Sequence, residues 1–524
     1  MQIELGGHFK RAAAKFDNRI AVQSAQRSLT YRQLREAANR IGSAIMRRGI
    51  GRGDRVAVLS HNRVELVELW VGLEQWGLAR VAMHTHFEMA IHARTLNDVG
   101  ATVLFFDTSF AAALEAHKAD MKSVRFFVAI GPNPPGWAIA YETLMSEGET
   151  DDPALDADES EICAIQFTTG TTGFPKPWIV THRAWRGLIA HNLEHLDTFG
   201  PGVASVNPED VNLHIHALQW ASGAQTLMPY MLRGAKNIIL DDQRFDPVRI
   251  IDTIVNEGVT GVFVPAPMLP PILELVGARG GIRHSVRRMV IFFATPELLQ
   301  AVTATLGPVW CHGFGSTEQG APTTRLTWHE AQENPARLAS VGRNASPFFE
   351  MAVVDEHGIR LKPGQVGEIV VRSAMSTSQY WNLPDKTDAA FLPGGWFRPN
   401  DIGYLDEEGF LYYLDRAKDR IHTDAGVVYP HVVESALLRH NTVAHCGVVG
   451  IGATGAQDVV AAILLKPNVS ATPAIEQEIL ETARSRLAAC EVPKRIVFVP
   501  ELPTVLGGAK VQREVLQQRL AAAI

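Results

Sequence analysis

Cysteine is scarce in this sequence, and long apolar runs are absent. The chain has 524 residues, and its four cysteines are far apart from one another: Cys163, Cys311, Cys446 and Cys490. This spacing argues against a disulfide framework and against a zinc knuckle. No apolar run approaches the roughly 18 residues that a membrane helix needs, and the first residues lack the pattern of a secretory signal. We therefore expect a reduced, cytoplasmic protein without a membrane span.

Basic residues are not in excess either. Lysine and arginine number 49 against 56 aspartates and glutamates, which gives a net charge of −7. Such a chain is a poor candidate for binding nucleic acid through phosphate contacts. Small anionic ligands stay possible, because local loops bind them regardless of the net charge. The apolar content of 46% is typical of a globular protein, and the length predicts two or more domains.

Short apolar segments alternate with helical patterns over about the first 300 residues. A helix is predicted at 64–77, and strands are predicted at 55–59, 79–83, 102–106, 124–130, 237–240, 261–264 and 288–293. Continuous apolar strands between helices are typical of parallel sheets that are covered on both faces. The sequence therefore predicts an α/β fold in this part of the chain.

The pattern changes after about Pro347. Short strands between glycine, proline and aspartate turns predict a small antiparallel β subdomain, with strands at 352–355, 368–372 and 409–414. The last part, roughly 110 residues, has the size of a small domain, with strands predicted at 444–450 and 459–465 and a helix at 474–487. We expect a large N-terminal domain, 1–415, of packed α/β sheets plus the β subdomain. A small mobile α+β domain, 416–524, follows a hinge near Lys418.

The segment 165–181, IQFTTGTTGFPKPWIVT, is the most informative part of the sequence. Its glycines let backbone N–H groups turn toward a ligand, its threonines add hydroxyl donors, and Lys176 supplies a positive charge suited to phosphate. The spacing differs from that of a Walker loop. A random surface turn seldom carries TTGTTGxPK, so the segment predicts a phosphate-binding loop.

This loop resembles the phosphate-binding signature of the adenylate-forming superfamily, which includes acyl- and aryl-CoA synthetases, peptide-synthetase adenylation domains and luciferases. Further motifs of that superfamily follow in the expected order: FGSTE at 314–318, GEIVVRS at 367–373, QYWN at 379–382, GWFRPNDIGYLDEEGFLYYLDRAKD at 395–419, VYP at 428–430 and LPTVLGGAKVQR at 502–513. Together they cover most of the chain from the phosphate loop onward. The set is highly specific.

The resemblance implies roles for individual residues at the nucleotide. Five residues would hold the β- and γ-phosphates of ATP: Thr168, Thr169, Thr171, Thr172 and Lys176. Thr317 would contact the α-phosphate, and Glu318 would bind Mg²⁺. Asp401 would accept hydrogen bonds from the ribose hydroxyls, with Arg416 assisting there. Donors, a cation and a metal suit a reaction that brings a carboxylate to ATP and releases pyrophosphate.

Two lysines near the C-terminus complete the implied machinery. Lys510, within a K-[IV]-x-R pattern, resembles the lysine that contacts the substrate carboxylate and α-phosphate during adenylation. Lys418 falls at the hinge position, about which the small domain of this superfamily rotates between the two half-reactions. A hinge needs to absorb only a few dihedral changes.

Several positions depart from the superfamily pattern. Phe292 and Phe293 stand where a small-residue segment normally lies flat against adenine, so these rings either stack on the base or fill its space. Asp424 and Ala425 replace glycines of a loop that approaches the pantetheine tunnel. Together these changes allow a specialised enzyme that performs only one half-reaction well.

The acid-binding site is less clearly indicated. Trp220 lies in ALQWASG, which resembles a segment that lines the acyl tunnel, and a core tryptophan is an equally good interpretation. Histidine pairs at 84 and 86 and at 214 and 216 are explained by alternation at strand ends. No carboxylate cluster accompanies them, so we assign no metal to them.

The function predicted first is an ATP- and Mg²⁺-dependent ligase that joins a small-molecule carboxylic acid, which the sequence does not identify, to CoA through an acyl-adenylate. One alternative performs a single half-reaction, shared with a partner enzyme, or transfers the acyl group to a carrier protein. Another is an adenylate-binding sensor without turnover. The presence of Lys176, Glu318, Asp401, Arg416 and Lys510 argues against the sensor.

Overall fold

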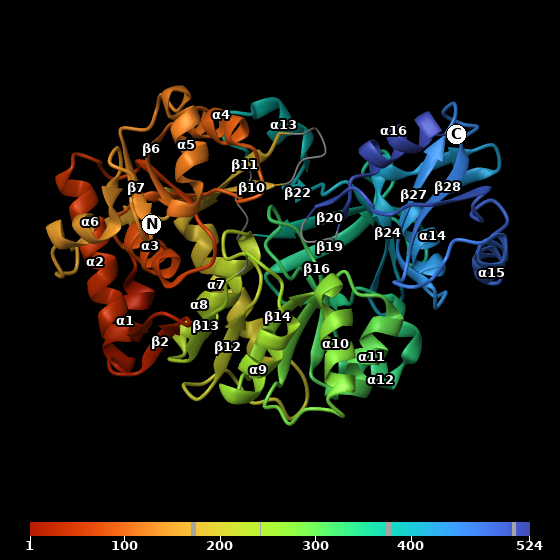
Figure 1. Ribbon diagram of the computed structural model, residues 1–524, viewed down its shortest axis with the longest axis horizontal. Helices are drawn as coiled ribbons and strands as arrows, with labels where there is room; N and C mark the ends of the chain where they lie inside the picture. The colour runs from red at the N-terminus through yellow and green to blue at the C-terminus, as the bar shows by residue number, and fades with distance from the viewer. Residues whose placement is uncertain (169–173, 242, 374–378, 506–509, 524) are drawn as a thin grey trace.

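The fold is described from a computed structural model of the chain. The structure describes residues 1–168, 174–241, 243–373, 379–505 and 510–523. A large body holds the chain from the N-terminus to the β subdomain, and the C-terminal segment forms a smaller body at one side (Figure 1). Within the described ranges, no helix combines the length and apolar character that a membrane crossing requires.

The first sheet has seven strands in the order β11-β10-β5-β4-β6-β7-β8. Their bounds are Arg55–Leu59 (β4), Ala79–Ala82 (β5), Ala101–Asp107 (β6), Phe126–Ile130 (β7), Ile139–Ala140 (β8), Ile162–Thr168 (β10) and Lys176–Thr181 (β11). The central strands are parallel, as predicted, and β11 is antiparallel to β10 because a short loop joins them.

Alternation along β4 explains why helices cover both faces of this sheet. Val56 and Val58 pack in a core with α2 (Tyr31–Arg47) and α3 (Val64–Gln75), whereas Ala57 and Leu59 pack in a second core with α4 (Met89–Val99) and α5 (Ala111–His117). This half also contains Gly7–Phe16 (α1) and Tyr141–Glu147 (α6). The helix predicted at 64–77 is thus confirmed and ends two residues earlier.

The second sheet has nine strands in the order β18-β17-β16-β15-β14-β12-β13-β2-β3. Their bounds are Ile20–Gln23 (β2), Ser28–Thr30 (β3), Val211–His214 (β12), Lys236–Ile239 (β13), Gly261–Pro265 (β14), Arg288–Phe292 (β15), Trp310–Phe314 (β16), Thr324–Thr327 (β17) and Arg343–Asn344 (β18). The prediction of a parallel sheet is correct for the middle and wrong at the edges, where β3, β17 and β18 are antiparallel.

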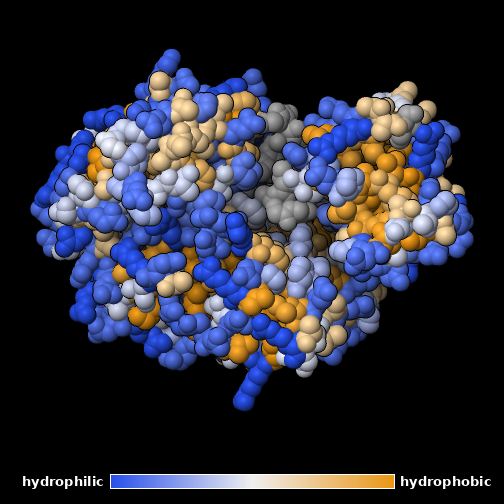
Figure 2. Space-filling view, viewed as in Figure 1, coloured by the Kyte–Doolittle hydropathy of each residue, from blue (hydrophilic) through white to orange (hydrophobic). Residues whose placement is uncertain are grey.

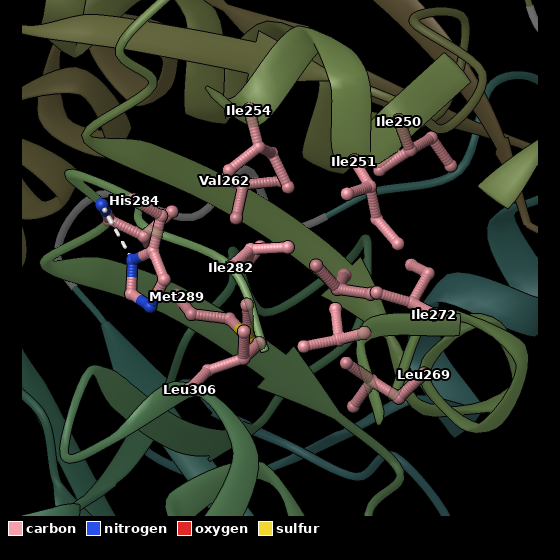
Figure 3. Close-up of a pocket in the computed structure, with 13 residues that line it drawn as sticks. Ile250, Ile251, Ile254, Val262, Leu269, Ile272, Ile282, His284, Met289 and Leu306 are labelled. Atoms are coloured by element: carbon pink, nitrogen blue, oxygen red, sulfur yellow. Dashed lines mark hydrogen bonds between the residues drawn. The ribbon is translucent and has the colours of Figure 1, made fainter. Parts of the chain in front are cut away.

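Helices lie on both sides of the second sheet. One face is covered by Pro247–Asn256 (α9), Leu269–Ala278 (α10) and Pro296–Leu306 (α11), and the other packs against His182–Asp197 (α7) and Ala221–Leu232 (α8). Figure 3 shows a hollow beneath α9 and α10 that aliphatic side chains line, with Met289 and His284 beside them. Its apolar lining residues belong to the core of the second sheet, so the hollow is a packing gap of that core. The Nδ1 of His284 accepts the Val286 N–H at 3.2 Å.

The β subdomain is antiparallel, as predicted. Its strands are Phe349–Val354 (β19), Gly367–Ser373 (β20), Phe391–Leu392 (β21), Trp396–Phe397 (β22), Asp401–Leu405 (β23) and Leu411–Arg416 (β24). Strand β24 ends directly before the short helical turn η5 (Ala417–Asp419), opposite the start of β23. The subdomain therefore leads the chain directly from the large body into the C-terminal one.

The C-terminal body is a small α+β unit, as predicted. Its main elements are Pro430–Leu437 (α14), Val443–Ile451 (β27), Asp458–Leu465 (β28), Pro473–Arg484 (α15), Arg495–Phe498 (β29) and Arg513–Ala523 (α16). Figure 2 shows apolar residues gathered on the visible face of this body, while much of the remaining visible surface is hydrophilic. The boundary between residues 415 and 416 stays a prediction.

Candidate active site

Two of the predicted phosphate-binding residues face each other across the β10–β11 hairpin. Thr168 ends β10 and pairs with Lys176, which begins β11. The predicted residues Thr169, Thr171 and Thr172 lie outside the described residues. The hairpin thus places a hydroxyl and an ammonium group at the two ends of the glycine-rich loop.

Lys176 is half-buried against an aromatic ring. Its Nζ lies 5.5 Å from the centre of the Tyr380 ring. Burial lowers the pKa of Lys176 below its usual value, and the positive charge of Lys386 lowers it further, while Glu318 opposes this shift. A partly dehydrated ammonium group of this kind gains most when a phosphate comes beside it.

Glu318 and Thr317 lie in the turn that follows β16. The Tyr380 hydroxyl donates a hydrogen bond to Glu318 Oε1 at 3.0 Å. Burial and the Glu318 charge both raise the pKa of Tyr380, so the phenol keeps its proton and stays a donor. Tyr380 therefore fixes the direction of the Glu318 carboxylate, and this residue had been given no role from the sequence.

Asp401 and Arg416 pair across β23 and β24 in the subdomain. Arg416 Nε lies 3.8 Å from Asp401 Oδ1, and the Asp401 side chain is buried. Burial acts to lower the pKa of Arg416, but Asp401 and other nearby groups, Glu318 among them, raise it overall. The Glu318 carboxylate therefore interacts electrostatically with both Arg416 and Lys176.

The structure thus brings together side chains that lie far apart in the sequence. Lys176 comes from the first sheet, and Glu318 comes from the turn after β16 of the second sheet. Asp401 and Arg416 come from the β subdomain. Tyr380 joins the first two groups by its ring and its hydroxyl. The site lies where the two large sheets and the subdomain meet, with both signs of charge in a partly dehydrated setting.

Comparison with known proteins agrees with this arrangement. The family model of AMP-binding enzymes matches residues 9–381, and the model of the C-terminal domain of AMP-binding enzymes matches residues 432–506. The chain belongs to the AMP-binding enzyme family. The resemblance to the adenylate-forming superfamily is confirmed, and so is the fold that it implies.

Curated relatives of this AMP-binding enzyme are ligases. A medium/long-chain-fatty-acid–CoA ligase of Mycobacterium tuberculosis is 29% identical over 517 residues, covering 96% of this chain and 88% of its own. A 2-succinylbenzoate–CoA ligase of Bacillus mycoides is 27% identical over 501 residues, covering 95% of each chain. The likeness therefore extends over both bodies of the molecule.

Solved structures share the fold of this AMP-binding enzyme over its whole length. An anthranilate CoA ligase in complex with anthranoyl-AMP aligns with a TM-score of 0.90 at 24% identity, covering 100% of this chain and 98% of that one. An o-succinylbenzoate CoA synthetase of Bacillus subtilis, in complex with ATP and a magnesium ion, aligns with a TM-score of 0.83 at 24% identity, covering 98% and 99%.

The predicted hinge lies beside a network of charges. Lys418, in η5, donates a hydrogen bond from Nζ to Glu514 Oε1 at 2.8 Å. Arg513 pairs with Glu434, and it also lies 3.6 Å from one carboxylate oxygen of Asp415 and of Asp419. Burial raises the pKa of Asp415 although Arg513 lowers it. The network ties the residues around the hinge to α14 and α16.

The predicted catalytic lysine, Lys510, begins the short strand β31 (Lys510–Val511), which pairs with β30 (Thr504–Val505). Its backbone is described, whereas its side chain lies outside the described part of the structure. Its role in adenylation stays a prediction.

The rings of Phe292 and Phe293 lie beside each other, with their centres 6.1 Å apart and their planes at 65°, but they differ in exposure. Phe292 is buried at the end of β15, with its ring centre 5.5 Å from that of Phe263. Phe293 follows with a φ of 66° and is 63% exposed. Because Phe292 is buried and Phe293 is exposed, Phe293 is the ring of this pair that is more open to a nucleotide base.

Asp424 and Ala425 form the exposed turn between β25 (Ile421–Thr423) and β26 (Gly426–Val428). The Thr423 hydroxyl closes this turn by donating to the Gly426 carbonyl at 2.8 Å. Gly426 has a φ of 140°, which other residues rarely adopt. The residue that follows Asp424 and Ala425 is therefore a glycine at the position whose φ favours glycine.

Trp220 caps α8, and its ring centre lies 6.2 Å from that of His216. His84 and His86 lie beyond the end of β5, not on it, which corrects the strand-end explanation for that pair. His84 Nε2 lies 3.2 Å from the Phe167 carbonyl. No group of three or more metal-ligating residues was found in the described ranges, and the histidine pairs stay without a metal assignment.

Proposed function

We propose that this AMP-binding enzyme activates a carboxylic acid with ATP and then transfers the acyl group to CoA. In the first step a carboxylate oxygen attacks the α-phosphate, the acyl-adenylate forms and pyrophosphate leaves. In the second step the CoA thiol attacks the mixed anhydride carbonyl, the thioester forms and AMP leaves. The relatives, which are acid–CoA ligases by name, support this choice.

The meeting of Lys176, Tyr380, Glu318, Asp401 and Arg416 is the observation that carries the proposal. We assign Thr168 and Lys176 to the β- and γ-phosphates and Thr317 to the α-phosphate. We assign Asp401 to the ribose hydroxyls, for which a buried carboxylate is a suitable acceptor. Arg416, beside Asp401, assists at the ribose. Lys176 supplies positive charge around the leaving pyrophosphate, where it lowers the barrier most.

The donor set fits Mg²⁺ at Glu318. Mg²⁺ is usually held by one or two carboxylates together with substrate phosphates. The hydrogen bond from the Tyr380 hydroxyl to Oε1 holds the Glu318 carboxylate in one orientation. Bound there, Mg²⁺ would neutralise charge on the phosphates of ATP. Tyr380 orients the carboxylate, and Lys176 balances its charge. We propose Glu318 as the protein ligand of this ion.

The molecule that receives the acyl group is the more specific part of the proposal. CoA is the acceptor in the names of the relatives cited above. A fatty acid–[acyl-carrier-protein] ligase of Streptomyces coeruleorubidus is also 28% identical over 503 residues, covering 94% of this chain and 92% of its own. A carrier protein is therefore the second candidate for the acceptor, and it needs the same adenylate.

Two assays run in parallel test the proposal. Exchange of labelled pyrophosphate into ATP across a panel of acids measures the first step alone, and thioester formation from synthetic acyl-adenylates measures the second. We expect acid-dependent exchange and CoA-dependent release of AMP. Exchange without transfer to CoA would favour the carrier protein, and absence of exchange with every acid would contradict the proposed first step.

A further inference from the structure

His216 is a buried histidine whose imidazole has no hydrogen-bond partner in the part of the chain that the structure describes. The residue is 1% exposed, and both Nδ1 and Nε2 lack a partner among the described residues. Its burial lowers the pKa to about 3, so the ring is neutral near pH 7 and carries one donor and one acceptor. Buried polar groups are nearly always paired, so one left open calls for a ligand or an ordered water.

The surroundings of His216 favour a ligand over a water. Its ring centre lies 4.7 Å from that of Phe263 and 6.2 Å from that of Trp220, and Phe263 in turn lies 5.5 Å from Phe292. A buried water needs two to four polar partners, and these neighbours are mainly aromatic rings. We call His216, Trp220, Phe263 and Phe292 the aromatic group.

The segment that carries His216 is held rigidly between the two large sheets. Asn62 Nδ2 donates to the His216 carbonyl at 2.8 Å, and Asn62 Oδ1 accepts the Leu218 N–H at 2.7 Å. Gln219 Nε2 donates to the Val58 carbonyl at 3.0 Å. Because its backbone is anchored in this way, the imidazole is already oriented for a partner, which lowers the cost of binding one.

The aromatic group also connects to the proposed catalytic site. A Cβ placed on Gly313 would lie 3.5 Å from Phe292 Cε2. Gly313 belongs to β16, whose end leads within a few residues to Thr317 and Glu318. If the carboxylate of the acid meets the α-phosphate near Thr317, the rest of the acid can lie along β16 toward Phe292 and the aromatic group.

We propose that His216 determines the specificity of the acid site by forming a hydrogen bond with a polar substituent on a compact, ring-bearing acid. The rings of Trp220, Phe263 and Phe292 offer faces and edges that suit stacking with such a ring. A hydroxyl, amino or carbonyl group on that ring would pair with the open imidazole nitrogens. An unbranched acyl chain would bury His216 with its nitrogens still unpaired. This inference rests on the proposed function.

The test compares acids that differ only in one substituent. Pyrophosphate exchange is measured with benzoate, its hydroxy and amino derivatives, and octanoate, in the wild type and in His216→Phe. We expect the wild type to prefer one substituted benzoate, and the variant to lose about tenfold in the ratio of kcat/KM for that acid to kcat/KM for benzoate. His216→Gln, which keeps a donor and an acceptor, should retain part of the preference.

His214→Phe is the matched control, because its imidazole bonds to Asn237 inside the sheet at 3.1 Å. It should lower the melting temperature but leave the ratio between substituted and unsubstituted acids unchanged. The same ratio in the wild type and in both His216 variants would overturn the inference and leave the proposed function intact, as would a clear preference for octanoate. No exchange with any acid would overturn the proposed function and this inference with it.

Discussion

At the scale of single residues, the polar groups of the site were largely predictable and their mutual support was not. Motif order identifies Lys176, Glu318, Asp401 and Arg416 as candidates, because they lie in three signatures, of which Asp401 and Arg416 share one. The role of Tyr380 needed the fold, since its hydroxyl meets Glu318 across 62 residues of sequence. The one available signal was the QYWN motif that contains it. For His216 the sequence offers no signal, because only its burial in the fold shows that its imidazole lacks a partner among the described residues.

Tyr380→Phe tests the support that this hydroxyl gives to Glu318. Loss of the hydrogen bond leaves the carboxylate free to rotate, and removal of a group that orients a metal ligand typically costs about tenfold or more in metal affinity. We therefore expect a roughly tenfold higher Mg²⁺ concentration for half-maximal pyrophosphate exchange. Tyr404→Phe, on the neighbouring subdomain strand, is the control. An unchanged Mg²⁺ dependence in Tyr380→Phe would contradict the assigned role.

Phe293→Gly tests whether the exposed ring stacks on adenine. Stacking predicts that titration calorimetry shows ATP binding weakened by about 1 kcal/mol. Glycine also relieves a positive φ, which costs a residue with a side chain about 1 kcal/mol, so the melting temperature should not fall. Tighter ATP binding in the variant would mean that the ring obstructs the base, and would favour the enzyme specialised in one half-reaction.

At the scale of elements, the apolar strands were predicted well and the sheet edges were not. Strand β4 matches its predicted bounds because its residues are buried apart from Arg55, which leaves little ambiguity in the pattern. The antiparallel strands β11 and β17 mix polar and apolar residues, and β18 is only Arg343–Asn344, so no apolar pattern specifies their direction. The network around Arg513 joins three separate segments and was likewise invisible in the sequence.

Arg513→Met tests this network. Removing the cation leaves Asp415, Asp419 and Glu434 close together, and a broken buried ion pair typically costs about 3–5 kcal/mol. Burial already raises the pKa of Asp415 and Asp419, and without the cation both pKa values rise further. An acid whose pKa is higher in the folded state loses stability as the pH rises through that pKa.

We therefore expect thermal unfolding to show a larger deficit of Arg513→Met at pH 7 than at pH 5. Arg519→Met removes a more exposed arginine that lies 3.9 Å from Glu501 and serves as the control. A deficit independent of pH would show that the loss comes from packing instead of from the unpaired carboxylates.

At the scale of the whole molecule, the site is assembled by two sheets and a subdomain, and the small C-terminal body follows it through η5. Contacts such as the 2.7 Å ion pair between Arg439 and Glu297 join this body to the large one.

The superfamily's alternation between half-reactions predicts that residues of the C-terminal body matter in one step more than in the other. Lys510→Ala should suppress pyrophosphate exchange far more than thioester formation from a supplied acyl-adenylate. Equal losses in the two assays would contradict that assignment.

The central claim is that this chain makes an acyl-adenylate and passes its acyl group to CoA. The most direct measurement mixes the protein in excess with ATP, Mg²⁺ and an acid that supports exchange, and follows the products by mass spectrometry before and after CoA is added. We expect acyl-adenylate bound to the protein before CoA is added, and its conversion to acyl-CoA and AMP afterwards. Formation of ADP and phosphate, or an adenylate that CoA leaves unchanged, would contradict this claim.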